Sequence, residues 1–220
     1  MTSVDDVKLQ LIQASKTLFD TGVMQHSGHG NMSARIDGDR IVITSGGTLH
    51  NLTPDDFAVV TLTGRVLEGR LDPVNAEIVS MHAGIYQVRD DVGSVIHTHS
   101  PSVTSFAVAN QPLPNASEAM LRFGVASEVP VAPWAPRGSK ESVSNIVDQV
   151  RAHPATPAVL LGNHGLLAFK VDPASTTALI VVMEEGAEAV IRSRLLGGEK
   201  PFPPGAFEWE RARMAEYGSQ

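Results

Sequence analysis

The sequence Gly93-Ser94-Val95-Ile96-His97-Thr98-His99-Ser100-Pro101 predicts a buried strand over residues 93–99 and, after Pro101, a helix over residues 102–109. Side chains at positions i and i+2 of a strand lie on the same face. His97 and His99 are therefore predicted to point the same way, with Cα atoms roughly 6–7 Å apart. Such a pair can bind one ion, although this spacing is also common by chance. The carboxyl end of a strand is where open α/β sheets tend to place their sites.

A third histidine lies about 65 residues further on, in the sequence Gly162-Asn163-His164-Gly165. We predict a turn here, between strands over residues 158–161 and 166–171, where bare backbone would let the imidazole approach an ion closely. A turn histidine exposed to solvent is the other interpretation. Three protein ligands and an open position are what a catalytic metal site requires. Because the chain contains no cysteine, a structural thiolate site is excluded.

The composition is that of an ordinary globular protein of 220 residues, with 42% hydrophobic and 19% charged residues. The net charge is −7 without a run of Lys or Arg, which argues against nucleic acid or an anionic membrane as a partner. No apolar run reaches the roughly 18 residues of a membrane span. Residues 1–6 lack the features of a signal peptide, so we expect a cytoplasmic protein.

The remaining pattern alternates helical and strand-like segments without an internal repeat or a linker. It predicts one α/β domain over residues 1–220, with a Pro- and aromatic-rich C-terminal tail from about residue 197. The predicted helices are 7–24, 76–88, 139–152 and 173–196, the further strands are 32–36, 41–44, 57–62 and 65–67, and residues 112–136 are predicted to be irregular.

Glu77 lies at the start of the predicted helix over residues 76–88. A carboxylate in a first turn usually interacts with the helix dipole. Next to a cation it could instead be a fourth ligand or a general base.

Five short motifs occur in one order along the chain. They are Gly30-Asn31-Met32-Ser33, Thr44-Ser45-Gly46, the segment from Pro73 to Glu77, His97-Thr98-His99-Ser100 and Asn163-His164-Gly165. In this order and spacing they resemble the class II aldolase/adducin-head family, whose sugar-phosphate members include fuculose-phosphate aldolases and ribulose-phosphate epimerases. The resemblance covers roughly residues 5 to 200.

The resemblance implies a three-layer α/β/α sandwich with a central, mainly antiparallel sheet. It also implies a homotetramer with active sites between subunits and a small-molecule substrate. By the same resemblance His97, His99 and His164 hold a divalent metal, with Zn2+ as the first choice and Mn2+ or Co2+ as alternatives. Glu77 matches the acidic residue that ligates the resting metal and then acts as acid/base.

The loops of the resemblance supply residues for the anionic end of the substrate. The matching positions are Gly30, Asn31, Thr44, Ser45 and Gly46. Backbone N–H groups of glycine-rich loops suit phosphate or carboxylate. Ordinary hairpin-turn chemistry is the other interpretation of these residues.

Three positions depart from the family pattern. Asn75-Ala76 replace two serines that add hydroxyls to the phosphate site, which favours a substrate without phosphate or with a carboxylate; Asn75 stays a candidate for substrate binding. Met120 stands where a proton-donating tyrosine is expected.

Arg122, near Glu118, could clamp a carboxylate or form a surface salt bridge. Tyr217 could be the C-terminal acid of some members or a packing aromatic.

The function predicted on this basis is that of a divalent-metal-dependent lyase. It would cleave a C–C bond by a (retro-)aldol reaction through a metal-stabilised enediolate, on a small hydroxy-ketone, keto acid or sugar phosphate. A metal-dependent decarboxylase is the alternative, and a 4-epimerase follows. A non-catalytic adducin-like scaffold is the rival of another class, but a scaffold has no physical need for four convergent ligands.

Overall fold

In the computed structural model, which describes residues 3–24 and 27–218, the strands form one mixed sheet in the order β4-β3-β2-β1-β5-β8-β7-β6. Neighbouring strands are antiparallel except for β6 and β7, which are parallel. The strands are β1 Gly30–Arg35, β2 Arg40–Thr44, β3 Phe57–Thr61, β4 Val66–Glu68, β5 Ser94–Thr98, β6 Val131–Ala132, β7 Ala158–Leu161 and β8 Gly165–Lys170.

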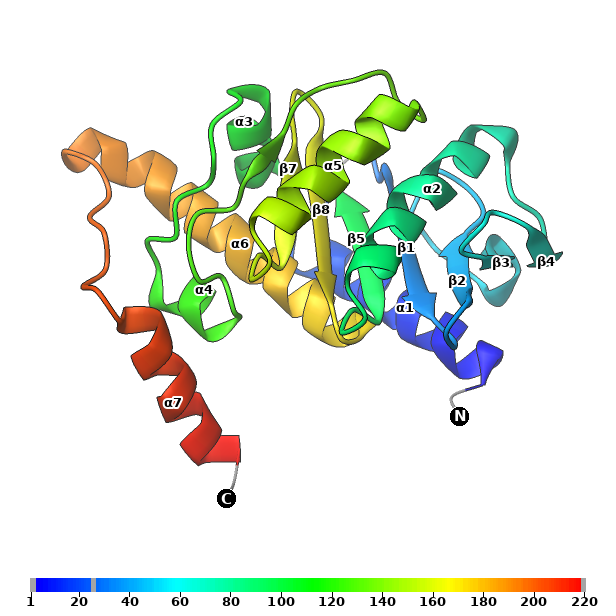
Figure 1. Ribbon diagram of the computed structural model, residues 1–220, viewed down its shortest axis with the longest axis horizontal. Helices are drawn as coiled ribbons and strands as arrows, with labels where there is room; N and C mark the ends of the chain where they lie inside the picture. The colour runs from blue at the N-terminus through cyan, green and yellow to red at the C-terminus, as the bar shows by residue number, and fades with distance from the viewer. Residues whose placement is uncertain (1–2, 25–26, 219–220) are drawn as a thin grey trace.

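Helices cover both faces of this sheet, with α2 and α5 on one face and α1, α3 and α6 on the other (Figure 1). The helices are α1 Val4–Asp20, α2 Pro73–Val88, α3 Pro101–Val108, α4 Glu118–Arg122, α5 Lys140–Ala152, α6 Pro173–Ser193 and α7 Ala206–Gly218, with the 3-10 turns η1 Pro54–Asp56 and η2 Arg194–Leu196. The predicted α/β/α sandwich with a mainly antiparallel sheet is therefore confirmed.

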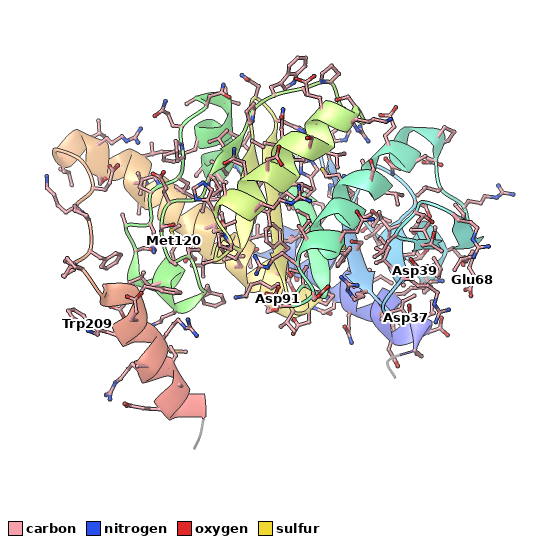
Figure 2. The ribbon with its side chains drawn as sticks, in the orientation of Figure 1. Asp37, Asp39, Glu68, Asp91, Met120 and Trp209 are labelled. Atoms are coloured by element: carbon pink, nitrogen blue, oxygen red, sulfur yellow. The ribbon has the colours of Figure 1, made fainter. Side chains whose placement is uncertain are left out.

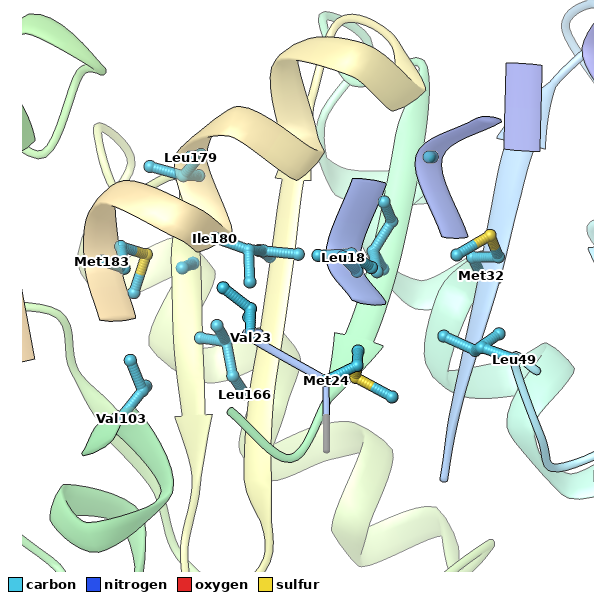
Figure 3. Close-up of a cluster of buried hydrophobic side chains, with 14 of the residues drawn as sticks. Leu18, Val23, Met24, Met32, Leu49, Val103, Leu166, Leu179, Ile180 and Met183 are labelled. Carbon is cyan, nitrogen blue, oxygen red and sulfur yellow. The ribbon is translucent and has the colours of Figure 1, made fainter. Parts of the chain in front are cut away.

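Alternating side chains of the strands build two apolar cores, one on each face of the sheet. In β2, Val42 packs toward α1 and α6, whereas Ile41 and Ile43 pack toward α2 and α5. Figure 3 shows the first core, where Leu18 of α1 and Ile180 of α6 meet Met32 and Leu166 of the sheet. Because β5 is buried on both faces, it is a rigid support for the residues at its end.

Some segments differ from the sequence-based expectation. The predicted irregular segment 112–136 contains the short helix α4 and the strand β6. The tail contains α7, whose residues follow the last proline, Pro204, and lack an apolar stripe that could have revealed the helix. The helix predicted over residues 7–24 begins at Val4, since Ser3 and Asp6 form a capping box, and it ends at Asp20, just before Gly22, which has a positive φ of 75°.

Among the described residues, no helix is both long enough and apolar enough to cross a bilayer.

Candidate metal centre

The strand register places His97 at the middle of the sheet. β5 lies between β1 and β8, where His97 pairs with Asn31 on one side and with Leu167 on the other. The Nδ1 atom of His97 lies 2.8 Å from the carbonyl oxygen of Leu166. A carbonyl oxygen can only accept, so Nδ1 donates the proton and Nε2 keeps its lone pair. The backbone thereby selects the nitrogen of His97 that can bind a cation.

The other two histidines converge on this nitrogen. His99 follows the end of β5, and its Nε2 lies 3.1 Å from Nε2 of His97. His164 lies in the turn between β7 and β8, with its ring centroid 4.7 Å from that of His97 and 5.0 Å from that of His99. One ligand nitrogen from each histidine lies within 4.8 Å of the other two. We call His97, His99 and His164 the histidine trio.

The turn that carries His164 depends on its neighbours. Asn163 has a positive φ of 57°, a conformation that asparagine tolerates better than most residues. A Cβ on Gly165 would lie 2.7 Å from the carbonyl oxygen of Thr98 and 2.8 Å from the ring of His99. Only glycine therefore lets β8 approach the end of β5 closely enough to bring the trio together.

Burial keeps the trio neutral near neutral pH. It lowers the pKa of His97 well below its ordinary value, with His164 and His99 adding to the effect. It lowers the pKa of His99 to about 4, helped by His164, and also lowers the pKa of His164. The guanidinium of Arg137 lowers the pKa of both His99 and His164 further. Neutral imidazoles with converging lone pairs are the form that a divalent cation requires, so the trio fits such an ion.

The trio lines a cavity of about 800 Å³ on the face of the sheet covered by α2 and α5. Apolar side chains of these helices form part of its wall. The polar and charged side chains of the wall, besides the trio, include His29, Asn31, Asp72, Asn75, Glu77, Arg137 and Ser142.

Glu77 reaches the cavity from the second turn of α2, because the helix begins at Pro73 rather than at residue 76, and it is therefore not a first-turn partner of the helix dipole. Among the described residues its carboxylate is not part of the closely spaced group formed by the trio. A Cβ on Gly138 would lie 2.5 Å from Oε2 of Glu77, so the loop before α5 packs directly on this carboxylate. Glu77 is exposed, and protons can therefore exchange between its carboxylate and solvent.

A buried chain of hydrogen bonds leads from the core to Asn31. Ser33 Oγ lies 2.9 Å from the hydroxyl of Tyr86 and 2.7 Å from Nδ1 of His82, and Nε2 of His82 lies 2.6 Å from Oδ1 of Asn31. Burial raises the pKa of Tyr86 and lowers the pKa of His82 to about 3, so both stay neutral. The spacing of His82 on the helix gave no signal for this role, because its partners come from β1.

Arg137 is a cavity residue that the sequence reasoning missed. Its Nη2 lies 3.3 Å from Oδ1 of Asn75, and Nδ2 of Asn75 donates to the carbonyl oxygen of Ser45 at 2.9 Å. The sequence signal that could have identified it is an arginine between Pro136 and Gly138, within a proline-rich loop.

Comparison with known proteins places the chain in a family. Residues 9–191 match the Class II Aldolase and Adducin N-terminal domain. The chain belongs to this class II aldolase family. It is 30% identical over 181 residues to an L-fuculose phosphate aldolase of Methanococcus maripaludis, an alignment that covers 81% of this chain and 93% of that one.

Two further relatives cover almost the whole chain. A 5-deoxy-D-ribulose 1-phosphate aldolase of Bacillus thuringiensis is 26% identical over 217 residues, which is 96% of each chain. The solved structure of an L-fuculose 1-phosphate aldolase superposes with a TM-score of 0.84 at 28% identity, covering 97% of this chain and 98% of that one. The family resemblance predicted from the five motifs is confirmed.

In this class II aldolase-family chain, some predicted loop residues have local structural partners. A Cβ on Gly30 would lie 2.6 Å from the carbonyl oxygen of His97, so Gly30 allows β1 to approach β5 at the cavity wall. The Thr44 hydroxyl accepts from the backbone N–H of Met32. Ser45 donates its N–H to Asp56 and accepts from Asn75. The cavity wall includes Gly47 but neither Thr44, Ser45 nor Gly46. Substrate binding by these three stays a prediction.

The predicted residues around α4 lie apart from the trio. Arg122 pairs with Glu118 at 2.6 Å and with Glu210 of α7 at 2.7 Å, and it does not line the cavity. Met120 of α4 (Figure 2) is fully buried, and its sulfur packs against Gly186 of α6. The backbone of Tyr217 belongs to α7, which packs on α4 and projects away from the sheet (Figure 1). Within one chain, neither Arg122 nor α7 comes to the histidine trio.

Proposed function

We propose that this chain is a divalent-metal-dependent carbon–carbon lyase that carries out a retro-aldol reaction on a small hydroxy-ketone, keto acid or sugar phosphate. The observation that carries this proposal is the convergence of the trio's nitrogens on the wall of a cavity of about 800 Å³. A cavity of this size suits a small molecule. The relatives named above, which are aldolases of phosphorylated sugars, support the reaction class.

In this proposal His97, His99 and His164 hold the cation, with Zn2+ as the first choice and Mn2+ or Co2+ as alternatives. Three imidazole nitrogens and no thiolate suit all three metals. A cation bound there supplies Lewis acidity, which stabilises the negative charge that develops when the C–C bond breaks.

The remaining steps belong to the side chains of the cavity. Glu77 gives and takes the proton at its carboxylate, from the wall of the same cavity as the trio and from a position open to solvent. The donor groups of Asn31 orient the substrate. The apolar wall formed by α2 and α5 limits the water around the reacting atoms.

We further propose a homotetramer whose active sites lie between subunits. Trp134, part of the cavity wall, is 63% exposed in one chain, and Leu195 and Leu196 are 89% and 90% exposed. Large exposed apolar side chains are typical of interfaces. In such an assembly Tyr217 would act as an acid on the site of another subunit, because α7 projects away from the trio of its own chain. Light scattering on the purified protein tests the assembly.

The decisive experiment combines metal analysis with a substrate screen. We expect about one divalent ion per chain in protein purified without chelator, and activity that disappears on chelation and returns with metal. Keto acids and ketose phosphates are screened for release of aldehyde and, separately, of carbon dioxide. Aldehyde release supports the retro-aldol reaction, and carbon dioxide alone identifies the decarboxylase instead. Full activity of metal-free protein would rule out the proposed centre.

A further inference from the structure

We propose that Arg137 is a specificity-determining residue, whose guanidinium binds an oxyanion of the substrate, either a carboxylate or a phosphate. The inference rests on the proposed function, because this oxyanion belongs to the molecule whose other end lies at the histidine trio. Arg137 and all three histidines line the same cavity.

The first argument is the orientation of Asn75. This side chain is 1% exposed, and its Nδ2 donates to the carbonyl oxygen of Ser45. The amide is thereby fixed with Oδ1 toward Nη2 of Arg137 at 3.3 Å. An oxygen atom at this point repels an anion but attracts a guanidinium. Asn75 is therefore a positioning residue that holds Arg137, rather than a donor to the substrate itself.

The second argument is the position of the loop. Gly138 has a φ of 76°, and the absence of a Cβ lets this loop lie against the carboxylate of Glu77. Arg137 is the chain neighbour of Gly138, so the loop that packs on Glu77 also carries Arg137 into the cavity that the trio lines. The path of the loop backbone, together with the length of the side chain, thus brings the Arg137 guanidinium to the cavity.

The third argument is charge. Asp72 and Glu77 are the carboxylates on the cavity wall, and an anionic ligand entering there meets their repulsion. Among the described residues that line the cavity, Arg137 is the only one with a positively charged arginine or lysine side chain. Its planar group, with five N–H donors, matches carboxylate and phosphate in bidentate geometry.

The test uses three probes that share the group HO–CH2–CO–CH2– and differ only beyond it. Hydroxyacetone is neutral, dihydroxyacetone phosphate carries a phosphate, and 5-hydroxy-4-oxopentanoate carries a carboxylate. Binding to the metal-loaded protein is measured by titration calorimetry for the wild type, Arg137→Gln, Arg137→Lys and Asn75→Ala. Arg151→Gln is the matched control, because Arg151 is an exposed arginine of α5 paired with Asp148. Thermal unfolding verifies that each variant is folded.

We expect one or both anions to bind more tightly than hydroxyacetone. Arg137→Gln should weaken anion binding by about 10- to 100-fold and leave hydroxyacetone binding unchanged. Arg137→Lys should recover part of the loss, Asn75→Ala should weaken anion binding less than Arg137→Gln, and Arg151→Gln should have no effect. The anion whose affinity falls most in Arg137→Gln indicates whether the substrate carries a phosphate or a carboxylate.

Equal binding of the three probes, or anion binding that Arg137→Gln does not change, would overturn the proposal. The same measurement after chelation separates it from the proposed function. Anion binding that depends on Arg137 but not on metal would support the oxyanion site and contradict the metal-centred lyase. Metal-dependent binding of hydroxyacetone without any preference for anions would contradict the role of Arg137 alone.

Discussion

The Nε2 atom of His82 lies 2.6 Å from Oδ1 of Asn31, and this contact determines which end of the Asn31 amide faces the cavity. Because Oδ1 of Asn31 can only accept, Nε2–H of His82 donates to it, so Nδ1 of His82 accepts from the Ser33 hydroxyl and Ser33 in turn accepts from the Tyr86 hydroxyl. Because Oδ1 of Asn31 is occupied in this way, its NH2 group is left to donate to a ligand. A neutral histidine inside the core thus gives the cavity a hydrogen-bond donor.

Replacement of His82 by leucine should release the Asn31 amide, so that its NH2 group is no longer held toward the cavity, and should leave the buried polar groups of Ser33 and Asn31 without this partner. We expect a loss of about 2–4 kcal/mol in the free energy of unfolding, measured by urea denaturation, since Ser33 and Asn31 both lose a partner. The KM for an oxygen-rich substrate should rise. His82→Gln, which keeps one donor and one acceptor, should restore most of both. Equal effects of the leucine and glutamine variants on KM would show that Asn31 is oriented without His82.

The stability of the protein should fall in mild acid. Burial lowers the pKa of His82 from 6.5 to about 3, so below pH 6.5 the unfolded chain binds a proton that the folded chain does not. This contribution is fully present above pH 6.5 and is lost as the pH falls, at up to about 1.4 kcal/mol per pH unit. Urea denaturation of chelator-treated protein from pH 7.5 to 4.5 measures the slope. In His82→Gln the pH dependence of the unfolding free energy should correspond to about one fewer proton taken up on unfolding. An unchanged slope would show that His82 does not contribute to the loss of stability in acid.

Substitutions in the metal centre should separate its ligands from its acid/base. We expect His99→Ala to lose the metal, because the trio then has two nitrogens, whereas Glu77→Gln should keep the metal and lose turnover. Elemental analysis and the substrate assay measure the two effects. Added metal should raise the melting temperature of the wild type and of Glu77→Gln but not of His99→Ala. Equal loss of metal in both variants would make Glu77 an ordinary ligand.

Gly138→Ala should displace the carboxylate of Glu77. The new Cβ would lie 2.5 Å from its Oε2. We expect a loss of activity together with a loss of about 1–2 kcal/mol in stability from the strained backbone. Gly22→Ala is a matched control, because Gly22 has a φ of 75° and its Cβ would meet nothing within 4 Å. If both variants lose stability alike and Gly138→Ala stays fully active, the close packing on Glu77 has no functional role.

The part of the site that was predictable from the sequence is the part with local spacing. His97 and His99 share a face because a strand alternates, and the turn around His164 is visible in its glycines. Arg137 and Asp72 belong to segments without periodicity, and they reach the cavity only because α2 and α5 pack on the same face of the sheet. Ser45 was predicted to bind substrate, but its backbone N–H and carbonyl form hydrogen bonds to Asp56 and Asn75 within the fold.

The three adjacent strands β1, β5 and β8 carry Asn31, His97 and Leu167 as direct neighbours, so the spacing between Asn31 and His97 cannot change without a shift of the whole sheet. Arg137 and Trp134 instead belong to the segment between β6 and α5, which no strand pairing constrains. The histidine trio and Arg137 therefore lie on separate elements, and the loop touches the proposed acid/base, Glu77, at Gly138. Exchange of residues 133–137 between relatives, with Gly138 kept, is thus the change expected to alter which substrate the pocket accepts without moving the trio or Glu77.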